Sequence, residues 1–556
     1  GSEMCIRDRA SALQAQGRHA QADEYLQQAV ALQPQSARDR LVLATSKLRL
    51  GERDAALMEL QQAIALDPEL TQGDVLLIRT HLQAGDFDQA ITAAERLRAK
   101  QPDSPDPFIL LGIAYAGKGE SDKARTAFEQ ALQKEAGNPS AAINLAAMAL
   151  SAGDVDAARG YYRQALAQYP GHARTLLRLA RLEAQQGNLA AARARLQEAV
   201  EKNPTALQPR VALGRFQLQA GKPLQALATV RDVPQGSAEH PDLLAVLGEA
   251  QLANGEAGNA ITTLKKLVEL QPASARAHYL LGSAYVTVNE IAEAKQQLLA
   301  AMQLDPDDML ASWLMTRLSS LQPSMEAKNA WVQQLKGLYP EHPQVQDLEA
   351  QLALLQGDAK QAVTIYKGLH ERFPAESVWT MNYANAQWAA GDRDGHIATL
   401  SAWLEQHPED VQAHYRLALS YLVLERFDAA KSAFNKVVER QPDTAVALNN
   451  LAFLLRDEDP QKARAYAERA YQLNPDPRIL DTYGVILLQQ GEMEQALKVL
   501  QQATVRTLNP TINFHYALAL AKNGRKDEAR KVLKRLAGAD FPEKAEADAL
   551  LAELGS

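Results

Sequence analysis

Proline recurs along this chain at a constant interval, and this regularity limits the possible folds more than any other feature of the sequence. The prolines in question stand at positions 34, 68, 102, 170, 204, 272, 306, 340, 374, 408 and 442, always 34 or 68 residues apart. A proline cannot continue the interior of a helix, because its nitrogen carries no hydrogen and its ring clashes with the preceding turn. Each proline is therefore expected to follow the end of a helix, in a chain built from repeats of one length.

Glycine and alanine return at the same interval as proline. Glycines, which allow the backbone to turn between two helices, stand at positions 17, 51, 85, 119, 153, 187, 221, 255, 357 and 391. Alanines, whose small side chains let a second helix pack closely on a first, stand at positions 22, 56, 90, 124, 158, 192, 226, 260, 294, 362 and 430. The shared phase predicts helix-turn-helix repeats that begin near residues 3, 37, 71, 105, 139, 173, 207, 241, 275, 309, 343, 377, 411, 445, 477 and 510.

The segment 107–133 shows the pattern of one repeat most clearly. Its turn at Gly119 is preceded by Phe108, Leu111, Gly112 and Tyr115 and followed by Ala124, Phe128 and Ala131. Apolar and small residues three or four positions apart indicate two amphipathic helices. This pattern resembles the tetratricopeptide repeat, with phenylalanine in place of its tryptophan. The resemblance implies an all-α fold, a right-handed superhelical solenoid of about fifteen to sixteen repeats.

The repeats divide the chain into three parts. Residues 1–9, GSEMCIRDR, break the pattern and are interpreted as a non-native scar, so the chain is expected to be truncated at its N-terminus. Residues 10–541 are predicted to form one continuous solenoid, and residues 542–556 a C-terminal capping helix. Two repeats are atypical. Residues 309–342 carry Pro323 and Lys328 in the glycine and alanine positions, and residues 445–476 have a shortened turn.

Residues that carry out catalysis or bind cofactors show no recognisable arrangement. The sequence contains no HExxH, GxSxG or GxxxxGK[ST] motif, and its single cysteine, Cys5, excludes a disulfide framework and a thiolate metal site. The formal net charge of −8 disfavours nucleic-acid binding. No stretch approaches the ~18 consecutive apolar residues of a membrane span. We therefore expect a protein that is not an enzyme and has no cofactor.

One group of candidate binding residues is basic. In tetratricopeptide arrays the first helix of each repeat lines the concave face, and this mapping predicts a basic run in the groove made of Arg174, Arg178, Arg181, Arg210 and Arg215. The first three are spaced four and three residues apart, so they share one helix face. Guanidinium groups placed this way can hold carboxylates or phosphates through paired hydrogen bonds. The alternative is a solvated face balanced by acidic residues of neighbouring repeats.

A second group combines amides with aromatic rings. Its members, with Trp379 beside them, are Asn382, Asn385, Trp388, Tyr415, Arg416, Asn449 and Asn450. Rings stack and amides form hydrogen bonds with backbone or hydroxyl groups, a combination that suits extended peptides or sugars. The alternative is that the tryptophans pack in the core while the asparagines cap helices or face water.

Asn144 is a candidate for a different reason. Some tetratricopeptide proteins hold a C-terminal carboxylate with a clamp of lysine, asparagine and basic residues from three successive repeats. Asn144, Arg174 and Arg178 match the later part of that clamp, but Ile109 and Ile113 stand where the first repeat should provide lysine and asparagine. A chaperone-tail adaptor is therefore not expected.

The C-terminal fifth of the chain carries a narrower resemblance. Residues 448–503, which begin LNNLAFLLRDEDPQKA, and residues 515–536, which begin HYALALAKNG, are similar to the TPR-repeat lipoproteins of the bacterial PEP-CTERM/exosortase system. This resemblance implies a scaffold in exopolysaccharide and biofilm matrix export or in protein sorting. It also implies a periplasmic or outer-membrane-associated location, with a lipid anchor that is missing from this chain.

The sequence thus predicts a protein–protein interaction scaffold. Its expected partners are proteins or peptides, or an exported polysaccharide held in the groove, with no nucleic acid among them. The alternative is a cytoplasmic adaptor or the regulatory module of a larger protein. The natural N-terminal sequence would separate these two interpretations.

Overall fold

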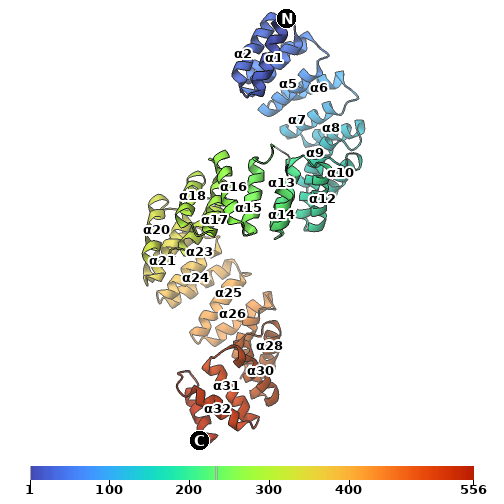
Figure 1. The fold of residues 1–556 in the computed structure, drawn as a ribbon. Helices are drawn as coiled ribbons and strands as arrows, with labels where there is room; N and C mark the ends of the chain where they lie inside the picture. The colour runs from blue at the N-terminus through green and yellow to red at the C-terminus, as the bar shows by residue number, and fades with distance from the viewer. Residues whose placement is uncertain (1, 232, 234–235, 556) are drawn as a thin grey trace. The chain divides into compact units, whose positions relative to one another are not determined.

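The structure is a computed structural model that describes residues 2–231, 233 and 236–555, and over these residues it consists of thirty-three α-helices and no strands (Figure 1). The expected all-α fold of helix-turn-helix repeats is confirmed. The first helices of the repeats are α1 (Ser2–Ala15), α3 (Ala37–Arg49), α5 (Thr71–Ala84), α7 (Asp106–Lys118), α9 (Pro139–Ser151), α11 (Ala173–Gln185), α13 (Leu207–Gln219), α15 (Pro241–Ala253), α17 (Ala275–Thr287), α19 (Met309–Ser320), α21 (Pro343–Leu355), α23 (Ser377–Ala389), α25 (Val411–Val423), α27 (Ala445–Leu455), α29 (Pro477–Gln489) and α31 (Pro510–Lys522).

Each first helix is followed by a second helix of the same repeat. The second helices are α2 (His19–Leu32), α4 (Arg53–Leu66), α6 (Phe87–Lys100), α8 (Ser121–Lys134), α10 (Val155–Gln168), α12 (Leu189–Lys202), α14 (Pro223–Arg231), α16 (Ala257–Leu270), α18 (Ile291–Leu304), α20 (Met325–Leu338), α22 (Ala359–Arg372), α24 (Arg393–Gln406), α26 (Phe427–Arg440), α28 (Pro460–Leu473), α30 (Met493–Arg506) and α32 (Lys526–Leu536). The last helix is α33 (Lys544–Glu553).

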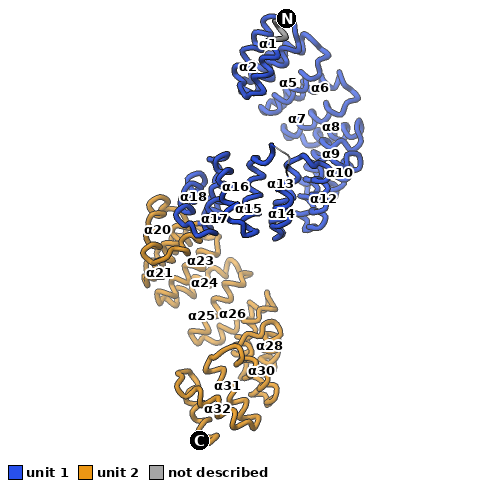
Figure 2. The backbone as a smooth tube through the Cα atoms, viewed as in Figure 1, with its two compact units in different colours: residues 1–314 blue, residues 315–556 orange. Residues whose placement is uncertain are grey.

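The chain divides into two compact units, residues 1–314 (unit 1) and residues 315–556 (unit 2) (Figure 2). Within each unit most helices pack on the next helix in sequence. Neighbouring first helices also touch, as α5 touches α7 in unit 1 and α27 touches α29 in unit 2. Because every such contact joins neighbouring repeats, each unit is a solenoid in which the first helices share one face.

The turn inside each repeat requires a left-handed backbone. All ten glycines predicted at this turn have φ between 68° and 85°. Glycine adopts this conformation readily because it has no Cβ. Asn289 and Glu425, which stand where the interval skips glycine, take the same conformation with φ of 62° and 57°.

Small residues are needed where two helices approach closely. A Cβ added to Gly112 of α7 would lie 2.5 Å from the ring of Phe128 on α8, well inside van der Waals contact. The alanines predicted to allow this approach are all fully buried. Two repeats have larger residues at the alanine position: Lys328 is half-buried, and His396 is only 4% exposed.

A polar side chain of the first helix binds the proline carbonyl that precedes it in several repeats. The donor is always six residues after the proline, and the pairs are Arg40 with Pro34, Arg210 with Pro204, His278 with Pro272, Gln346 with Pro340 and His414 with Pro408. The nitrogen-to-oxygen distances are 3.0 or 3.1 Å. These hydrogen bonds satisfy a carbonyl that follows the previous helix and has no partner within it.

The irregular repeats keep both of their helices. In residues 309–342 the connection from α19 to α20 ends at Ser324, whose hydroxyl accepts a hydrogen bond from the Ala327 amide over 3.2 Å. In residues 445–476, α27 ends at Leu455 and α28 begins at Pro460, with the Asp459 side chain accepting a hydrogen bond from the Lys462 amide. A side-chain cap therefore starts the second helix in both cases.

The two ends of the chain are helical. The segment interpreted as a scar lies largely within α1, where Arg7 donates a hydrogen bond to Asp39 over 2.6 Å. Its non-native origin stays a prediction. The α33 helix packs against α32, and its Ala547 is buried with Phe514 and Leu533. Within the described part of the chain, no helix has both the length and the apolar character that a bilayer crossing demands.

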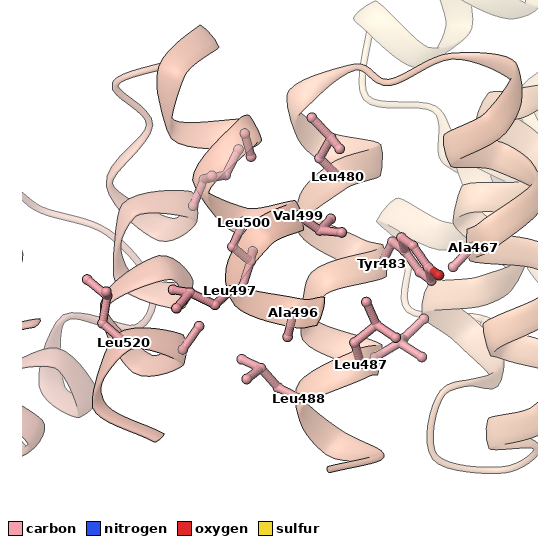
Figure 3. Close-up of a cluster of buried hydrophobic side chains, with 14 of the residues drawn as sticks. Ala467, Leu480, Tyr483, Leu487, Leu488, Ala496, Leu497, Val499, Leu500 and Leu520 are labelled. Carbon is pink, nitrogen blue, oxygen red and sulfur yellow. The ribbon is translucent and has the colours of Figure 1, made fainter. Parts of the chain in front are cut away.

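The cores are clusters formed by consecutive helices. In the cluster drawn in Figure 3, Tyr483 and Leu487 of α29 lie beside Ala496 and Leu500 of α30. Leu520 of the following repeat joins the same cluster. Each repeat therefore completes its core with side chains of its neighbours, which leaves the outward-facing side chains of the first helices available for binding.

Candidate functional site

A cavity of about 390 Å³ lies across four consecutive first helices of unit 1. It is lined by Val75, Arg79 and Leu82 of α5, by Asp106, Ile109, Leu110 and Ile113 of α7, by Ser140, Ile143 and Asn144 of α9, and by Arg174 of α11. The aliphatic side chains form the floor, where Ile109 and Ile143 are buried. The charged and polar side chains surround it. Asn144 and Arg174, both predicted from the sequence, thus belong to one groove.

The arginines at this groove lack acidic partners. Arg79, Arg174, Arg178 and Arg181 are all exposed, and none forms an ion pair within the described residues. Arg159, by contrast, lies on the second helix α10 and binds Glu183 through a 2.9 Å ion pair. The predicted face on α11 is therefore present and uncompensated. Asp106 is the one acidic residue that lines the cavity.

The local environment on α11 reflects this positive charge. The pKa of His172, which caps the helix by accepting a hydrogen bond from the Thr175 amide, is lowered by burial and further by the charge of Arg174. Burial raises the pKa of Tyr162, and the nearby charge of Arg178 opposes that shift. A neutral His172 adds no charge of its own, so an anion at this face would meet the guanidinium groups alone.

The remaining two arginines of the predicted basic run already form hydrogen bonds or an ion pair within the protein. Arg210 donates its guanidinium hydrogen bonds to the carbonyls of Pro204 and Thr229, so it links the end of the preceding repeat to the second helix of its own repeat. Arg215 is exposed and pairs with Asp242 of the next repeat over 3.4 Å. The basic face that is free to bind a partner consists of Arg174, Arg178 and Arg181, with Arg79 added from α5.

Sequence reasoning overlooked Arg79, although a signal for it exists. Arg79 is the ninth residue of the repeat that begins at residue 71, a position that commonly faces the groove in this type of array. It was missed because it stands three repeats before Arg174, the first residue of the predicted basic run. The structure brings it to the same cavity because first helices of successive repeats lie side by side.

The aromatic–amide group of unit 2 separates into core and surface residues. Trp379 is buried, and its indole nitrogen donates to Glu376 over 2.9 Å. Asn382 donates to the buried carboxylate of Asp347 over 3.3 Å. Burial raises the pKa of Asp347, an effect opposed by its hydrogen bond from Tyr366. Asn382 and Trp379 therefore stabilise the fold of their repeat.

A second cavity, of about 260 Å³, lies in unit 2. Its polar and aromatic lining consists of Asn385 and Trp388 of α23, His396 of α24, and Arg416 and Ser420 of α25. Arg416 donates to the side-chain oxygen of Asn385 over 3.0 Å. Leu419 and Val423 of α25 add an apolar wall. Three predicted residues, Asn385, Trp388 and Arg416, are thus brought together here.

His396 was not predicted, yet it forms the inner wall of this cavity. Its Nδ1 lies 2.7 Å from the carbonyl of Ala384, and its Nε2 lies 2.7 Å from the hydroxyl of Ser420. A carbonyl only accepts, so Nδ1 carries the hydrogen. The single hydrogen of the Ser420 hydroxyl is shared between Nε2 of a neutral ring and the Arg416 carbonyl, which lies 2.9 Å from the hydroxyl oxygen. Burial lowers the pKa of His396, which agrees with this neutral form.

The other members of the group lie near the same face. Tyr415 is half-buried, and its ring centroid lies 6.1 Å from that of Phe434. Asn450 donates to the backbone carbonyl of Val446 within α27. The side-chain oxygen of Asn449 is enclosed and accepts no hydrogen bond from the described residues. Their binding role stays a prediction.

Metal binding has no support in the described ranges 2–231, 233 and 236–555. No three histidine, cysteine, aspartate or glutamate side chains lie close enough together there to hold a metal ion. The candidate sites consist of arginines, amides and apolar side chains, groups that can form ion pairs, hydrogen bonds and apolar contacts with another molecule.

Two family models, both described as tetratricopeptide repeat, match this chain. The first matches residues 47–113, 149–213, 183–250, 251–318 and 487–554, and the second matches residues 7–74, 109–173, 381–445, 415–477 and 453–511. These matches cover more than half of the chain, so the protein belongs to the tetratricopeptide repeat family. Proteins built from this repeat are generally non-catalytic scaffolds that bind other proteins.

The individual proteins and structures that are similar to this chain match it either over a short stretch or at low sequence identity. A "TPR repeat-containing protein PA4667" of Pseudomonas aeruginosa is 40% identical over 88 residues, a stretch that spans 15% of this chain and 15% of that protein. The crystal structure of the APC/C hetero-tetramer Cut9–Hcn1 is similar with 14% identity and a TM-score of 0.29, over 82% of this chain and 96% of that one. The structure of Naa15/Naa10 bound to HypK-THB is similar with 14% identity and a TM-score of 0.38, over 99% and 94% of the two chains.

Proposed function

We propose that this protein is a binding scaffold whose groove in unit 1 holds an extended acidic segment of a partner protein. One observation carries the proposal: a cavity with an aliphatic floor is bordered by exposed arginines that have no acidic partner. The floor lies on α5, α7 and α9, and the arginine face continues along α11 from Arg174 to Arg181. The complementary ligand has one apolar side chain and several carboxylates.

The expected energies favour a ligand with many contacts. Burying one leucine-sized side chain on Ile109 and Ile143 contributes about 1.5–3 kcal/mol. An exposed arginine–carboxylate pair contributes only about 0.2–1 kcal/mol and is screened by salt. Affinity must therefore come from several such contacts made together along the groove. Binding that weakens as salt is added is a direct consequence.

The test is charge reversal on α11. The variant R174E/R178E/R181E should weaken binding of a fluorescent peptide that places one leucine among glutamates. We expect a loss of roughly tenfold or more at low salt, because three exposed pairs at about 0.5 kcal/mol each are lost and repulsion is added. Fluorescence anisotropy with the full chain measures this directly.

A matched control carries the same charge change on second helices. Arg96, Arg163 and Arg193 are exposed on α6, α10 and α12, and the variant R96E/R163E/R193E should bind the peptide nearly as tightly as the unmodified chain. Equal affinities of the two triple variants would reject the groove as the binding site. A peptide with lysines in place of glutamates should not bind.

We further propose that the scaffold works in the bacterial envelope, in exopolysaccharide and biofilm matrix export or in protein sorting, at a periplasmic or outer-membrane-associated position. The support is the resemblance of residues 448–503 and 515–536 to TPR-repeat lipoproteins of the exosortase system. Fractionation of cells that produce the full-length natural protein should place it with the membrane or periplasmic fraction. Recovery in the cytoplasmic fraction alone would instead support the adaptor interpretation.

A further inference from the structure

The cavity in unit 2 has an unusual charge balance. Arg416 is half-buried, and the one side chain to which it donates is the neutral amide of Asn385. Within the described residues no carboxylate lies within ion-pair distance of Arg416. A half-buried cation without a counter-ion loses hydration and gains little in return. An anion that enters the cavity would supply the missing partner.

The acidic residues near this cavity are occupied elsewhere. Asp392 caps α24 by accepting a hydrogen bond from the Gly395 amide over 2.9 Å. Asp394 pairs with Arg426 at 3.6 Å. Asp347 accepts hydrogen bonds from Tyr366 and Asn382 in the neighbouring repeat. None of these carboxylates forms an ion pair with Arg416, so its guanidinium can bind an anionic ligand.

The side chains that line the cavity determine which uncharged group the bound anion should have. Arg393 stacks its guanidinium 3.9 Å from the centroid of the Trp388 ring and also donates to the Trp388 carbonyl, which fixes the indole in place. The His396 ring lies 5.0 Å from the same indole, in an edge-on contact. Leu419 and the largely exposed Val423 complete the apolar part of the lining.

We propose that this cavity binds a monocarboxylate carried on a small apolar or aromatic body. The carboxylate lies against the guanidinium of Arg416, which has N–H groups to spare beyond the one used by Asn385. The body of the ligand lies against Trp388, Leu419 and Val423. The volume of about 260 Å³ is below the ~300–1,000 Å³ of sites for drug-sized ligands, so one ring or one branched chain fits.

One other ligand class, a neutral sugar, fits less well. A sugar needs an open ring face to stack on, but one face of Trp388 is covered by Arg393 and Trp379 is buried. A sugar would also leave Arg416 without a counter-ion. The site lies in unit 2 and does not depend on the acidic segment proposed for unit 1.

The test compares acids with their amides on the full chain. Isothermal titration with 3-phenylpropionate should show binding with a dissociation constant in the range of about 1 mM, and 3-phenylpropionamide should bind at least tenfold more weakly. A short peptide that ends in phenylalanine is compared in the same way, as the free acid and as the C-terminal amide. Stronger binding of the free acid would point to a metabolite, and stronger binding of the peptide acid to a chain end.

Substitution of Arg416 locates the binding. R416Q should abolish binding of both acids, and R416K, which keeps the charge but not the planar fork, should retain part of it. R535Q, at an exposed arginine of α32, removes the same charge elsewhere and should leave binding unchanged. The proposal is overturned if acid and amide bind equally to the unmodified chain, if R416Q binds like R535Q, or if no acid binds at about 10 mM.

Discussion

Glu425 and Asn289 occupy a backbone conformation that glycine provides in twelve other repeats of the described chain. A left-handed φ brings the Cβ of an ordinary residue close to the following carbonyl oxygen, at a cost of roughly 1–2 kcal/mol. Asparagine tolerates this conformation better than glutamate because its short side chain forms local hydrogen bonds. The side chains of both residues are exposed, so their replacement removes no packing.

We therefore expect Glu425→Gly to stabilise its repeat by about 0.5–1 kcal/mol, because glycine removes the strain but gives back some of the gain through its more flexible unfolded state. Asn289→Gly should give a smaller gain. Native-state hydrogen exchange of α25 and α26 measures the first effect without unfolding the whole chain. The reverse change, Gly391→Ala, should destabilise its turn. A loss of protection in Glu425→Gly would contradict the strain argument.

At the scale of single residues, the sequence predicted where the turn and the small residue of each repeat lie. It did not predict which atoms a buried polar side chain contacts. The 34-residue interval identified the turn and the alanine position in most repeats, because both requirements are set by backbone geometry alone. The same interval marks His396 as an exception to alanine, so its burial was within reach of sequence reasoning. Its two hydrogen-bond partners were not, because Ala384 and Ser420 come from two different first helices.

At the scale of helices, Arg210 shows why a predicted surface residue can serve the fold. It was assigned to the groove because the first helix of each repeat lines the concave face in tetratricopeptide arrays. Its guanidinium instead reaches the Pro204 carbonyl, in the arrangement that Arg40 and His414 also adopt. A sequence does not show which carbonyls at a helix end lack a partner. The direction of the side chain therefore could not be predicted.

The helices α29 and α31 are joined by a buried ion pair. His515 Nδ1 lies 2.8 Å from Asp481 Oδ1, and both side chains are less than one-fifth exposed. Burial on its own lowers the pKa of His515. The hydrogen bond to Asp481 and the negative charges of Asp481, Glu543 and Glu546 outweigh burial, so the pKa is raised above its usual value of about 6.5.

This raised pKa gives the C-terminal repeats a defined pH dependence. The folded state binds the His515 proton more tightly than the unfolded state, so the stabilisation is complete below about pH 6.5 and is lost as the pH rises through the folded pKa. Hydrogen exchange of α29 and α31 should therefore show protection that falls as the pH rises above about 6.5. Because such charged hydrogen bonds contribute about 1.5–3 kcal/mol, the effect is measurable.

Two substitutions isolate the pair. Asp481→Asn keeps the side-chain shape but removes the charge, so it should remove most of this pH dependence. His515→Gln should lower protection at about pH 6 and have less effect at about pH 9. A pH profile that is the same in Asp481→Asn and in the unmodified chain would show that the ion pair does not control these helices.

At the scale of the whole molecule, the fold was predictable and the binding surfaces only partly so. Contacts inside a repeat are local, so a pattern within 34 residues determines them. The unit 1 cavity, in contrast, draws Arg79, Ile109, Asn144 and Arg174 from four different repeats. No single repeat contains the site, and the sequence of one repeat does not show which residues of the next will lie beside it.

The family models do not match most of the atypical repeat. The family models leave residues 319–380 unmatched, where Pro323 and Lys328 replace the expected glycine and alanine. The structure nevertheless continues with α20, α21 and α22 at their expected places. The length of the repeat is preserved even where its residues are not. Spacing is therefore a stronger indicator of this fold than residue identity.

The strictly neighbour-to-neighbour contacts also bear on how the protein is made. A chain whose contacts join segments close in sequence has little loop-closure entropy to overcome, so its folding is fast. During synthesis, at roughly 5–20 residues per second, each repeat needs only the next repeat to emerge from the ribosome before its core can close. Helices such as α7 and α8 can thus be in place long before α32 is translated, and the unit 1 groove can be finished while unit 2 is still being made.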